Sequence, residues 1–392
     1  MILKGGRMID KSNYKEHTDK YFLRSKHILE QEGINPAVRY QVFARQDIPS
    51  LKGIEEAASF IRDVTGDKVK VYALNDGDSY SSGEPIMKLE GRVQDLIDLE
   101  TGYLGIISGA LTGPIDLGEV RKAARGIRQA APGKKIFYMG ARHFDPSLDE
   151  KISRICYEEG FDGASTDMGA KAWGKEGMGT EPHALILSYT AHTIENGITG
   201  SPTAEATRGF DKHIDKSVPR VVLPDTFNRE IYDTIDTAQA VPSLKGARID
   251  TCGENWMQGT SPLPMEGSFP IDEDLLKIKD KIGRHFEGKG VKVEGVWALR
   301  RQLDTWGLGK LELTVSSGFN EEKTKAFMIA DELYQEKYGK PLFENIGTGS
   351  IAKPIMTTSD IVAYYSEKQN VWVELSKEGR EERPSERLVE RK

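Results

Sequence analysis

Acidic side chains follow two neighbouring apolar segments in the second half of the chain. Asp225 comes directly after the segment RVVLP, and Asp250 ends the segment ARID. Two carboxylates beside a phosphate group usually hold Mg²⁺ or stabilise a developing positive charge. We therefore take Asp225 and Asp250 as candidate catalytic and Mg²⁺-binding residues. The alternative is a structural ion pair between one of them and a lysine or arginine.

Two later segments end in clusters of small residues, which favour the binding of a phosphate group. Small residues let backbone N–H groups approach an anion, and the dipole of a following helix favours negative charge. The candidate phosphate-binding residues are Ser317, Gly318, Gly347, Thr348 and Gly349. Glu321 and Glu322 open the helix after the first cluster, so either they point away from the anion or the anion lies in the loop itself. The alternative is that both clusters are only tight turns.

Three further polar residues are candidates for substrate contacts or chemistry. Arg142 follows the segment IFYM and offers a bidentate fork for a carboxylate or a phosphate. Thr166 follows the segment FDGAS and is a candidate substrate contact. His183 ends the loop that begins at Gly179 and opens a helix. It can act as a nucleophile toward phosphate or as a simple helix cap, and the local features favour the cap.

These residues need a scaffold that brings several strand ends together. From about residue 115, short apolar segments alternate with helical patterns, which is typical of parallel βαβ units. Six or seven such units favour a βα barrel, whose active residues lie at the carboxyl ends of its strands. The expected strands are residues 136–139, 161–165, 220–223, 247–249, 311–315 and 341–346. Ser147–Glu150 matches a capping box, and residues 274–286 predict one helix.

The rest of the chain predicts a second unit. Residues 1–114 are expected to form an N-terminal mixed α/β domain, and residues 115–350 the barrel with the active site. Residues 351–392 are expected to supply C-terminal strands that rejoin the N-terminal domain, followed by a charged tail. The predicted fold class is therefore α/β, an irregular βα barrel plus a mixed α/β domain. We expect the charge-dense tail from Ser376 to fray.

Composition excludes several functional classes. The 392 residues carry a formal net charge of −7, which argues against a nucleic-acid surface. No apolar stretch approaches the ~20 residues that span a bilayer, and the first residues lack the apolar core of a secretory signal. The two cysteines, Cys156 and Cys252, form neither a metal knuckle nor a disulfide framework. We expect a cytoplasmic protein that contacts neither nucleic acid nor a membrane.

Taken in order, these clusters resemble the nicotinate phosphoribosyltransferases, from about Asp19 to Val362. The segments that carry the resemblance are Thr18-Asp-Lys-Tyr21, Glu100-Thr101, Gly140-Ala-Arg142, Gly179-Thr180-x-x-His183-Ala184, Asp225-Thr226-Phe227, Arg248-Ile249-Asp250, Ser317-Gly318 and Gly347-Thr348-Gly349. No single segment is decisive, but their order and spacing together are specific. The resemblance is greater to the short archaeal-type members than to the longer bacterial enzymes.

The resemblance implies the type II phosphoribosyltransferase fold and a step in NAD salvage. Nicotinate and 5-phosphoribosyl 1-pyrophosphate would give nicotinate mononucleotide and pyrophosphate, with Mg²⁺ as cofactor. It also implies that Tyr21 stacks on the pyridine ring and that Thr180 and Arg248 contact substrate. In ATP-coupled members the histidine at the position of His183 is phosphorylated. A homodimer or higher homo-oligomer is implied, in which Tyr21 of one chain covers the barrel mouth of another.

The chain departs from the family pattern at two places. After Asp250 the common Ser-Gly-Asp is replaced by Thr251-Cys-Gly-Glu254, which leaves the role of Glu254 open. Some archaeal-type members carry a four-cysteine zinc site near the C-terminus, and this chain has no cysteine beyond Cys252, so no zinc is expected. Two other functions stay open: a quinolinate phosphoribosyltransferase, and a non-enzymatic sensor that binds phosphoribosyl pyrophosphate.

Overall fold

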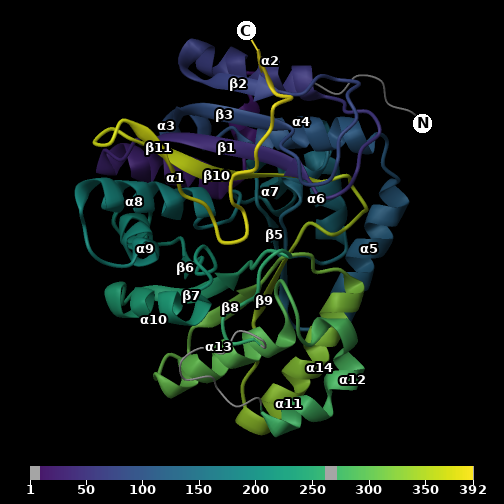
Figure 1. Cartoon of the computed structure of the whole chain (residues 1–392). Helices are drawn as coiled ribbons and strands as arrows, with labels where there is room; N and C mark the ends of the chain where they lie inside the picture. The colour runs from purple at the N-terminus through teal and green to yellow at the C-terminus, as the bar shows by residue number, and fades with distance from the viewer. Residues whose placement is uncertain (1–8, 261–271, 392) are drawn as a thin grey trace.

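Two six-stranded sheets organise the chain, and Figure 1 shows one above the other. The computed structural model describes residues 9–260 and 272–391. Each sheet has its own hydrophobic core, and residues from both ends of the chain build the upper one.

The upper sheet joins the N-terminal region to the C-terminal region. Its strands lie in the order β11-β10-β1-β3-β2-β12, and all neighbours are antiparallel. They are β1 (Ala37–Ala44), β2 (Lys70–Ala73), β3 (Met87–Arg92), β10 (Thr357–Ser366), β11 (Val371–Glu374) and β12 (Val389–Arg391). Val42 faces Met87 on one side and Ser359 on the other, so the returning C-terminal strand lies directly against β1. This confirms the mixed α/β unit that the sequence predicted.

Helices cover the upper sheet and connect it to the rest of the chain. They are α1 (Lys20–Glu32), α2 (Ile54–Thr65), α3 (Val93–Leu96) and α4 (Glu100–Thr112). Helix α4 is buried along most of its length, and its glycines let other backbone approach closely. A Cβ at Gly109 would lie 2.6 Å from the Cα of Asp145, and one at Gly105 would lie 2.9 Å from Pro146. Glycine is therefore required where α4 meets residues 144–146.

The lower sheet is parallel and curls into a half-barrel. Its order is β5-β4-β9-β8-β7-β6, and the two edge strands, β5 and β6, do not pair with each other. The strands are β4 (Lys135–Tyr138), β5 (Gly163–Ala164), β6 (Arg220–Val222), β7 (Leu244–Ile249), β8 (Glu312–Val315) and β9 (Asn345–Thr348). The predicted irregular barrel is thus confirmed in its open form.

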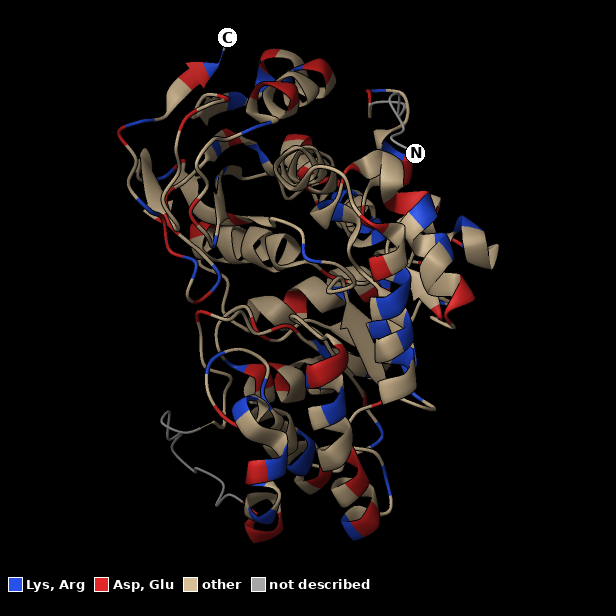
Figure 2. Cartoon of the chain, turned by 90° about the vertical axis from the view of Figure 1, so that its right-hand side faces the viewer, with Lys and Arg blue, Asp and Glu red and all other residues tan. Residues whose placement is uncertain are grey.

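Most of the remaining helices pack on the outside of the half-barrel (Figure 1). They are α5 (Leu117–Ala130), α6 (Asp149–Glu158), α7 (Asp167–Ala170), α10 (Glu230–Ala240), α11 (Glu273–Lys277), α12 (Lys279–Ile282), α13 (Val293–Thr305) and α14 (Glu321–Tyr338). Two others, α8 (His183–Asn196) and α9 (Pro202–His213), bury their apolar residues in the core of the upper sheet. Acidic and basic residues are interspersed along the helices on the face that Figure 2 shows. Among the described residues, no helix combines the length and apolar character needed to cross a membrane.

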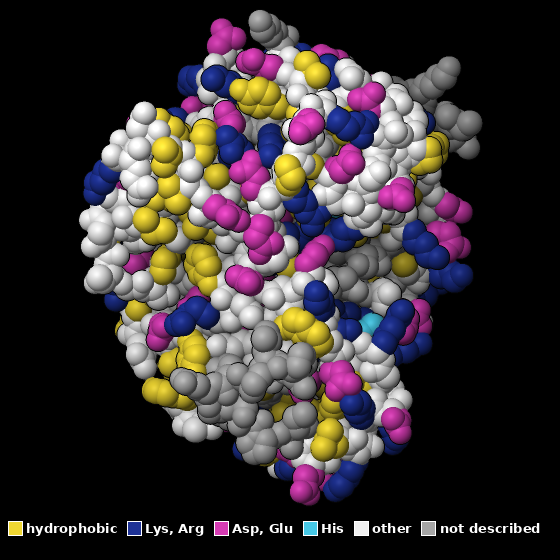
Figure 3. Space-filling view, in the orientation of Figure 1, with side chains coloured by type: hydrophobic (Ala, Val, Ile, Leu, Met, Phe, Trp, Pro, Cys, Tyr) yellow, Lys and Arg dark blue, Asp and Glu magenta, His cyan; other side chains and the backbone are white. Residues whose placement is uncertain are grey.

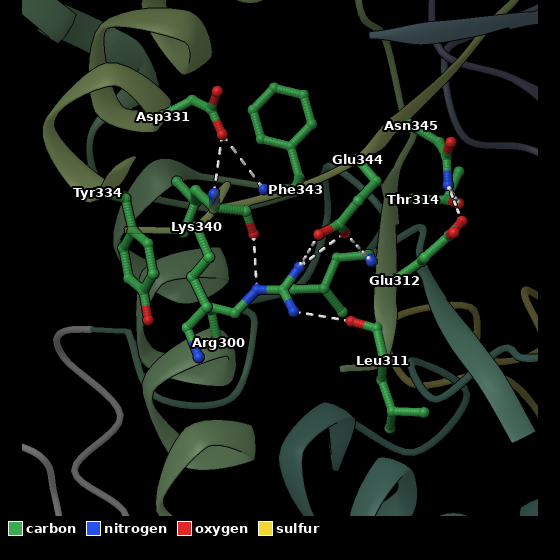
Figure 4. Close-up of polar contacts among 12 residues, drawn as sticks. Arg300, Leu311, Glu312, Thr314, Asp331, Tyr334, Lys340, Phe343, Glu344 and Asn345 are labelled. Atoms are coloured by element: carbon green, nitrogen blue, oxygen red, sulfur yellow. Dashed lines mark hydrogen bonds and ion pairs between the residues drawn. The ribbon is translucent and has the colours of Figure 1, made fainter. Parts of the chain in front are cut away.

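A buried arginine ties α13 to the lower sheet (Figure 4). Arg300 is 1% exposed and donates two hydrogen bonds to Glu344, at 2.9 and 2.7 Å. It also donates to the carbonyl oxygens of Leu342 and Leu311. All these partners lie next to β8 or β9, so the arginine fixes the helix against the strand starts.

Two local predictions were wrong. The turn before α6 is capped by Asp145, whose carboxylate accepts from the N–H of Ser147 at 2.9 Å, so Ser147–Glu150 is not the capping box. The predicted helix over 274–286 is broken into α11, α12 and a 3-10 turn. Gly283 has φ +61° and ends α12, because a residue with positive φ cannot continue a right-handed helix.

The charged tail does not fray. The N–H of Glu378 donates to the carbonyl of Thr226, and β12 pairs with β2. Glu382 forms ion pairs with Arg39 and Lys88 of the upper sheet. Glu382, which we expected to be solvated with the rest of the tail, therefore pairs with residues of β1 and β3.

Candidate active site

One cavity of about 1190 Å³ lies between the concave side of the half-barrel and the upper sheet. The carboxyl ends of β4, β7, β8 and β9 open into it, as do α1 and the start of α8. Figure 3 shows lysine and arginine side chains around the hollow between the two halves of the molecule. The expected meeting of strand ends at one site is therefore found.

A histidine and a lysine share one oxygen of Asp225. The Nε2 of His183 lies 3.1 Å from Oδ2 of Asp225, and the Nζ of Lys377 donates to the same oxygen at 2.5 Å. Lys377 also donates to the backbone carbonyl of Asp250 at 3.2 Å. Asp225 is 0% exposed and Lys377 is 4% exposed, so this contact is desolvated.

Asp250 lies beside this group and faces the cavity. Its Oδ1 accepts from the hydroxyl of Ser316 at 2.7 Å, and its Oδ2 lies 3.1 Å from Nη1 of Arg248. Burial alone would raise the pKa of Asp250, but Arg248 and Lys377 hold it well below its ordinary value. Asp250 is therefore an anion at neutral pH.

Burial and the charge of Lys377 keep the imidazole of His183 neutral. Burial, and after it the positive charge of Lys377, holds the pKa of His183 well below its ordinary value. Burial would lower the pKa of Lys377, but Asp225 and Asp250 raise it above its ordinary value. Burial raises the pKa of Asp225 above its ordinary value, and the ammonium of Lys377 opposes this rise. The contact with Lys377 favours a carboxylate at Asp225, which only accepts hydrogen bonds, so neutral His183 donates Nε2–H to Asp225 and keeps Nδ1 as its basic nitrogen. The cap that the local features favoured is wrong, because Pro182 precedes the helix and no side chain caps it.

Arg142 and Tyr21 form a second polar group in the cavity. The Nη2 of Arg142 donates to the hydroxyl of Tyr21 and lies 3.2 Å from Asp19, while its Nη1 donates to Glu100 at 2.9 Å. Burial alone would lower the pKa of Arg142, but Tyr21, Asp19 and Glu100 hold it well above its ordinary value. The ring of Phe22 lies 4.4 Å from that of Tyr21, so an aromatic surface adjoins the cation.

The loop after β8 has a strained backbone. Ser317 and Gly318 both have positive φ, +70° and +76°. A non-glycine residue in this region is strained, and such strain is typical of functional sites. Lys323 lies beneath the loop and donates to the carbonyl of Ser317 at 2.7 Å. Burial lowers the pKa of Lys323 to about 7.

The acidic first turn of α14 does not face this loop. Glu321 pairs with Lys325, and Glu322 pairs with Arg284 and lies near His285. Glu321 thus pairs within α14 and Glu322 with the 3-10 turn Gly283–His285, and neither lines the cavity, which resolves the conflict that the sequence left open.

The loop after β9 completes the strand ends. The hydroxyl of Thr348 donates to the carbonyl of Phe319 at 2.5 Å and accepts from the N–H of Ser350 at 3.0 Å, so it ties the two loops together. A Cβ at Gly349 would lie 2.9 Å from the Cα of Gly140, so glycine is needed at this close approach. Gly347, Thr348 and Gly349 all line the cavity with Ser317 and Gly318.

Of the two threonines expected to contact substrate, Thr180 lines the cavity and Thr166 does not. Thr180 lines the cavity while its hydroxyl donates to the carbonyl of Val221 at 2.7 Å. The hydroxyl of Thr166 is buried, donates to Asp149 at 2.5 Å and accepts from the N–H of Gly169. The side chain of Thr166 therefore caps α7 and does not reach the cavity.

Tyr21 lies in the cavity of its own chain, whereas we expected it at the barrel mouth of a partner. The bridge between Asp19 and Thr166 and the bond from the N–H of Lys20 to the carbonyl of Ser165 fix the start of α1 beside β5. This anchoring directs Tyr21 toward Arg142 of the same chain.

The sequence analysis missed three buried cations at or beside the cavity, namely Lys377, Arg380 and Lys323. Lys377 and Arg380 come from the tail that was expected to fray, and Arg380 pairs with Glu254 at 3.2 Å. Glu254 is thereby placed in an ion pair with Arg45 and Arg380. Lys323 lies in the first turn of α14, and its position in the sequence does not distinguish it from a lysine that is exposed to solvent. The only available signal was the density of lysine and arginine in residues 377–383.

The two strand-end aspartates do not fit a Mg²⁺ ion held by the protein. Three of their four carboxylate oxygens are occupied by Lys377, Ser316 and Arg248. Mg²⁺ needs six oxygen ligands near 2.1 Å, and two cations already lie against this pair. Within residues 9–260 and 272–391, no group of three or more His, Cys, Asp or Glu side chains is arranged to hold a metal. The structure instead shows the ion pair with a lysine, which was the alternative for Asp225.

A curled parallel half-barrel beneath an antiparallel sheet is the type II phosphoribosyltransferase fold. The model of the family described as "Quinolinate phosphoribosyl transferase, N-terminal domain" matches residues 19–110. Solved structures show the fold over nearly the whole chain. Nicotinate phosphoribosyltransferase from Porphyromonas gingivalis has a TM-score of 0.60 and 13% identity over 92% of both chains. The enzyme of that name from Vibrio cholerae has a TM-score of 0.59 and 13% identity over 95% of this chain and 91% of its own.

Curated relatives share the name nicotinate phosphoribosyltransferase. Nicotinate phosphoribosyltransferase 1 of Arabidopsis thaliana is 24% identical over 302 residues, which are 71% of this chain and 51% of that protein. Nicotinate phosphoribosyltransferase pncB1 of Mycobacterium tuberculosis is 26% identical over 178 residues, 45% of this chain and 37% of its own. The chain thus spans about half the length, or less, of these curated relatives. The matches confirm the resemblance to the nicotinate phosphoribosyltransferases.

Proposed function

We propose that the chain is an enzyme that transfers a phosphoribosyl group from phosphoribosyl pyrophosphate to nicotinate, in NAD salvage. The observation that carries the proposal is the set of groups that line one cavity. Arg142 with the aromatic ring of Tyr21, the small-residue loops after β8 and β9, and the carboxylate of Asp250 all line it. A pyridine carboxylate, a phosphate and a ribose that becomes cationic need these kinds of partner.

In the proposed reaction the ring nitrogen of nicotinate forms a bond to C1 of the ribose. The bond from C1 to the pyrophosphate oxygen breaks, and pyrophosphate leaves with the electron pair. No proton moves, because the ring nitrogen is already a nucleophile. The protein orients the partners, and the carboxylate of Asp250 favours the positive charge that develops on the sugar.

A direct assay tests this function. The protein is incubated with phosphoribosyl pyrophosphate and Mg²⁺, together with nicotinate, nicotinamide or quinolinate in separate reactions, and mononucleotide is measured by chromatography. We expect product with nicotinate. Product with quinolinate alone, together with release of CO₂, would replace the assignment. Tight binding of phosphoribosyl pyrophosphate without any product would point to a sensor.

Quinolinate phosphoribosyltransferase is the second candidate, because the matching family model bears that name. Quinolinate carries one more carboxylate than nicotinate and needs a further cation beside the ring. Arg142 lies beside the rings of Tyr21 and Phe22, and its fork faces Asp19 and Glu100. Two acidic neighbours disfavour a second substrate carboxylate, so nicotinate is the substrate that we favour.

Coupling to ATP is part of the proposal. The γ-phosphate of ATP would pass to the imidazole of His183, with ADP as the leaving group, and water would later release inorganic phosphate. The neutral imidazole with one nitrogen held by Asp225 supports this role. We propose Mg²⁺ as the companion of the substrate's pyrophosphate.

We also propose that the chain forms a homodimer. Ile194 and Ile198 are 53% and 48% exposed at the end of α8. Figure 3 shows apolar side chains gathered on this side of the molecule, over α8 and α9. Isologous two-fold dimers are the commonest way to bury such a surface. Sedimentation analysis measures the assembly directly.

A further inference from the structure

The C-terminal segment 375–380 crosses the mouth of the half-barrel and is pinned to the loops after two strands. The N–H of Leu375 donates to the carbonyl of Val362, and the N–H of Glu378 donates to the carbonyl of Thr226. The thiol of Cys252 lies 3.6 Å from the carbonyl of Glu378. These contacts place the segment between the loops that follow β6 and β7. Its side chains are therefore part of the strand-end cluster.

The one cation that this segment inserts between the aspartates is Lys377. Its ammonium lies 2.5 Å from Asp225 and 3.2 Å from the carbonyl of Asp250. Arg248 meets the other carboxylate at 3.1 Å. The two negative charges of the aspartates are thus matched by two positive charges of the protein. A divalent ion at this place would add two charges beside a lysine and an arginine, and their repulsion is strong in a buried site.

We propose that Lys377 is a positioning residue, whose ammonium takes the place of a divalent cation at the Asp225–Asp250 pair. It holds Asp225 in the orientation that receives the imidazole of His183, because both contact the same oxygen. The tail thereby completes the site and makes it independent of bound metal before substrates arrive. The role of Lys377 in catalysis rests on the proposed function. Its place between Asp225 and Asp250 does not depend on that function.

Metal binding without substrates tests the inference. Mn²⁺ has the ligand preferences of Mg²⁺ and its free form is measured by electron paramagnetic resonance. The wild-type chain, without phosphoribosyl pyrophosphate, is expected to show no stoichiometric Mn²⁺ site. In Lys377→Met the two carboxylates lose their ammonium, so we expect about one Mn²⁺ per chain, bound at least about tenfold more tightly than by wild type. Adding Asp225→Asn to Lys377→Met should remove the new site.

Two control variants separate charge from folding. Lys377→Arg keeps a cation and should resemble wild type, with no new Mn²⁺ site. Lys134→Met removes another buried lysine, which pairs with Asp331 at 2.7 Å away from the cavity, and should also create no site. A wild-type chain that binds one Mn²⁺, lost on Asp225→Asn, would overturn the proposal. So would a folded Lys377→Met that binds no more Mn²⁺ than wild type. Because no substrate is present, these results do not depend on whether nicotinate is turned over.

Discussion

At the scale of single residues, Arg142 is the cation best placed for a substrate carboxylate. Its guanidinium also holds Asp19 and Glu100, so alanine would leave two buried acids unpaired and confuse binding with stability. Arg142→Lys keeps the charge and loses the bidentate fork. We expect the KM for nicotinate to rise at least about tenfold, because a charge-assisted pair contributes about 1.5–3 kcal/mol.

Steady-state kinetics with each substrate varied in turn measures this effect. Arg39→Lys is the matched control, since Arg39 also bridges two acids, Glu90 and Glu382, but lies on β1 outside the cavity. The control should leave both KM values within about twofold. An unchanged KM for nicotinate in Arg142→Lys would move the carboxylate to another part of the cavity.

A second residue-scale prediction concerns His183. If its imidazole accepts a phosphoryl group, ATP stimulates turnover of the wild type, and His183→Asn abolishes that stimulation while slow ATP-independent synthesis remains. His192→Asn, on the same helix and bonded to Asn196, serves as the control and keeps the stimulation. Acid-labile ³²P on the wild type after incubation with [γ-³²P]ATP reports the intermediate itself. Equal stimulation in His183→Asn would exclude the coupled mechanism.

The site residues that the sequence could predict are those that directly follow strands. Asp225, Asp250, Arg142 and the two small-residue loops follow apolar strands, and the topology alone brings them together. Lys377 could not be predicted in this way, because it lies 152 positions after Asp225 in the chain and reaches it only when the intervening chain has folded back. Nothing in a charge-dense tail distinguishes a buried lysine from a solvated one.

At the scale of elements, the C-terminal segment is the part whose role differs most from expectation. A chain that ends at Leu375 loses the inserted cation and β12, whereas a chain that ends at Arg387 loses β12 alone. We expect the longer deletion to reduce kcat/KM at least about a hundredfold, since a buried ion pair at the site is broken. The shorter deletion should change kcat/KM by less than about threefold and mainly lower the melting temperature.

Activity and circular dichroism of both truncated chains test this assignment. The comparison is informative only between folded proteins, so the far-ultraviolet spectra must match that of the full chain. A folded chain that ends at Leu375 with full activity would show that residues 376–387 only cover the site.

The elements that could be predicted are those with a clear local pattern. The alternation of short apolar strands with helices identified all six strands of the lower sheet, with ends displaced by a few residues. The broken helix over 274–286 could not be predicted, because an isolated glycine such as Gly283 is tolerated in many helices. The strand β1 and the pairing of β12 depend on partners far away in the chain, so no local signal fixed them.

At the scale of the whole molecule, buried carboxyl groups couple folding to pH. Burial raises the pKa of Glu181 to about 8, and the hydroxyl of Thr207 at 3.0 Å only partly opposes it. Burial likewise raises the pKa of Glu230 to about 7. Below its raised pKa each group keeps its proton in the folded protein. In the unfolded chain it ionises near the ordinary pKa of a glutamate. Between those two pKa values the folded state binds more protons, so this contribution to stability falls as pH rises.

Other buried groups increase stability as pH rises. The pH profile of wild-type stability alone therefore does not isolate the contribution of the buried carboxyl groups. Burial lowers the pKa of His143 to about 4, and the unfolded chain then binds more protons up to about pH 6.5. Burial also lowers the pKa of Lys323 to about 7, which acts in the same sense at higher pH. The contribution of one carboxyl group must therefore be measured against a variant that cannot ionise.

Glu181→Gln provides that comparison, because the amide has nearly the same shape and stays neutral. The stabilisation of wild-type Glu181 is fully present below pH 4.5 and is lost as pH rises to about 8. Relative to wild type, the variant should therefore gain about 1 kcal/mol of unfolding free energy for each pH unit between 6 and 8. Urea unfolding at pH 6, 7 and 8 measures the difference. Glu158→Gln, an exposed position on α6, should give a profile parallel to wild type. If the profile of Glu181→Gln is also parallel, Glu181 is ionised in the folded protein, and a cation of the cavity must compensate its charge.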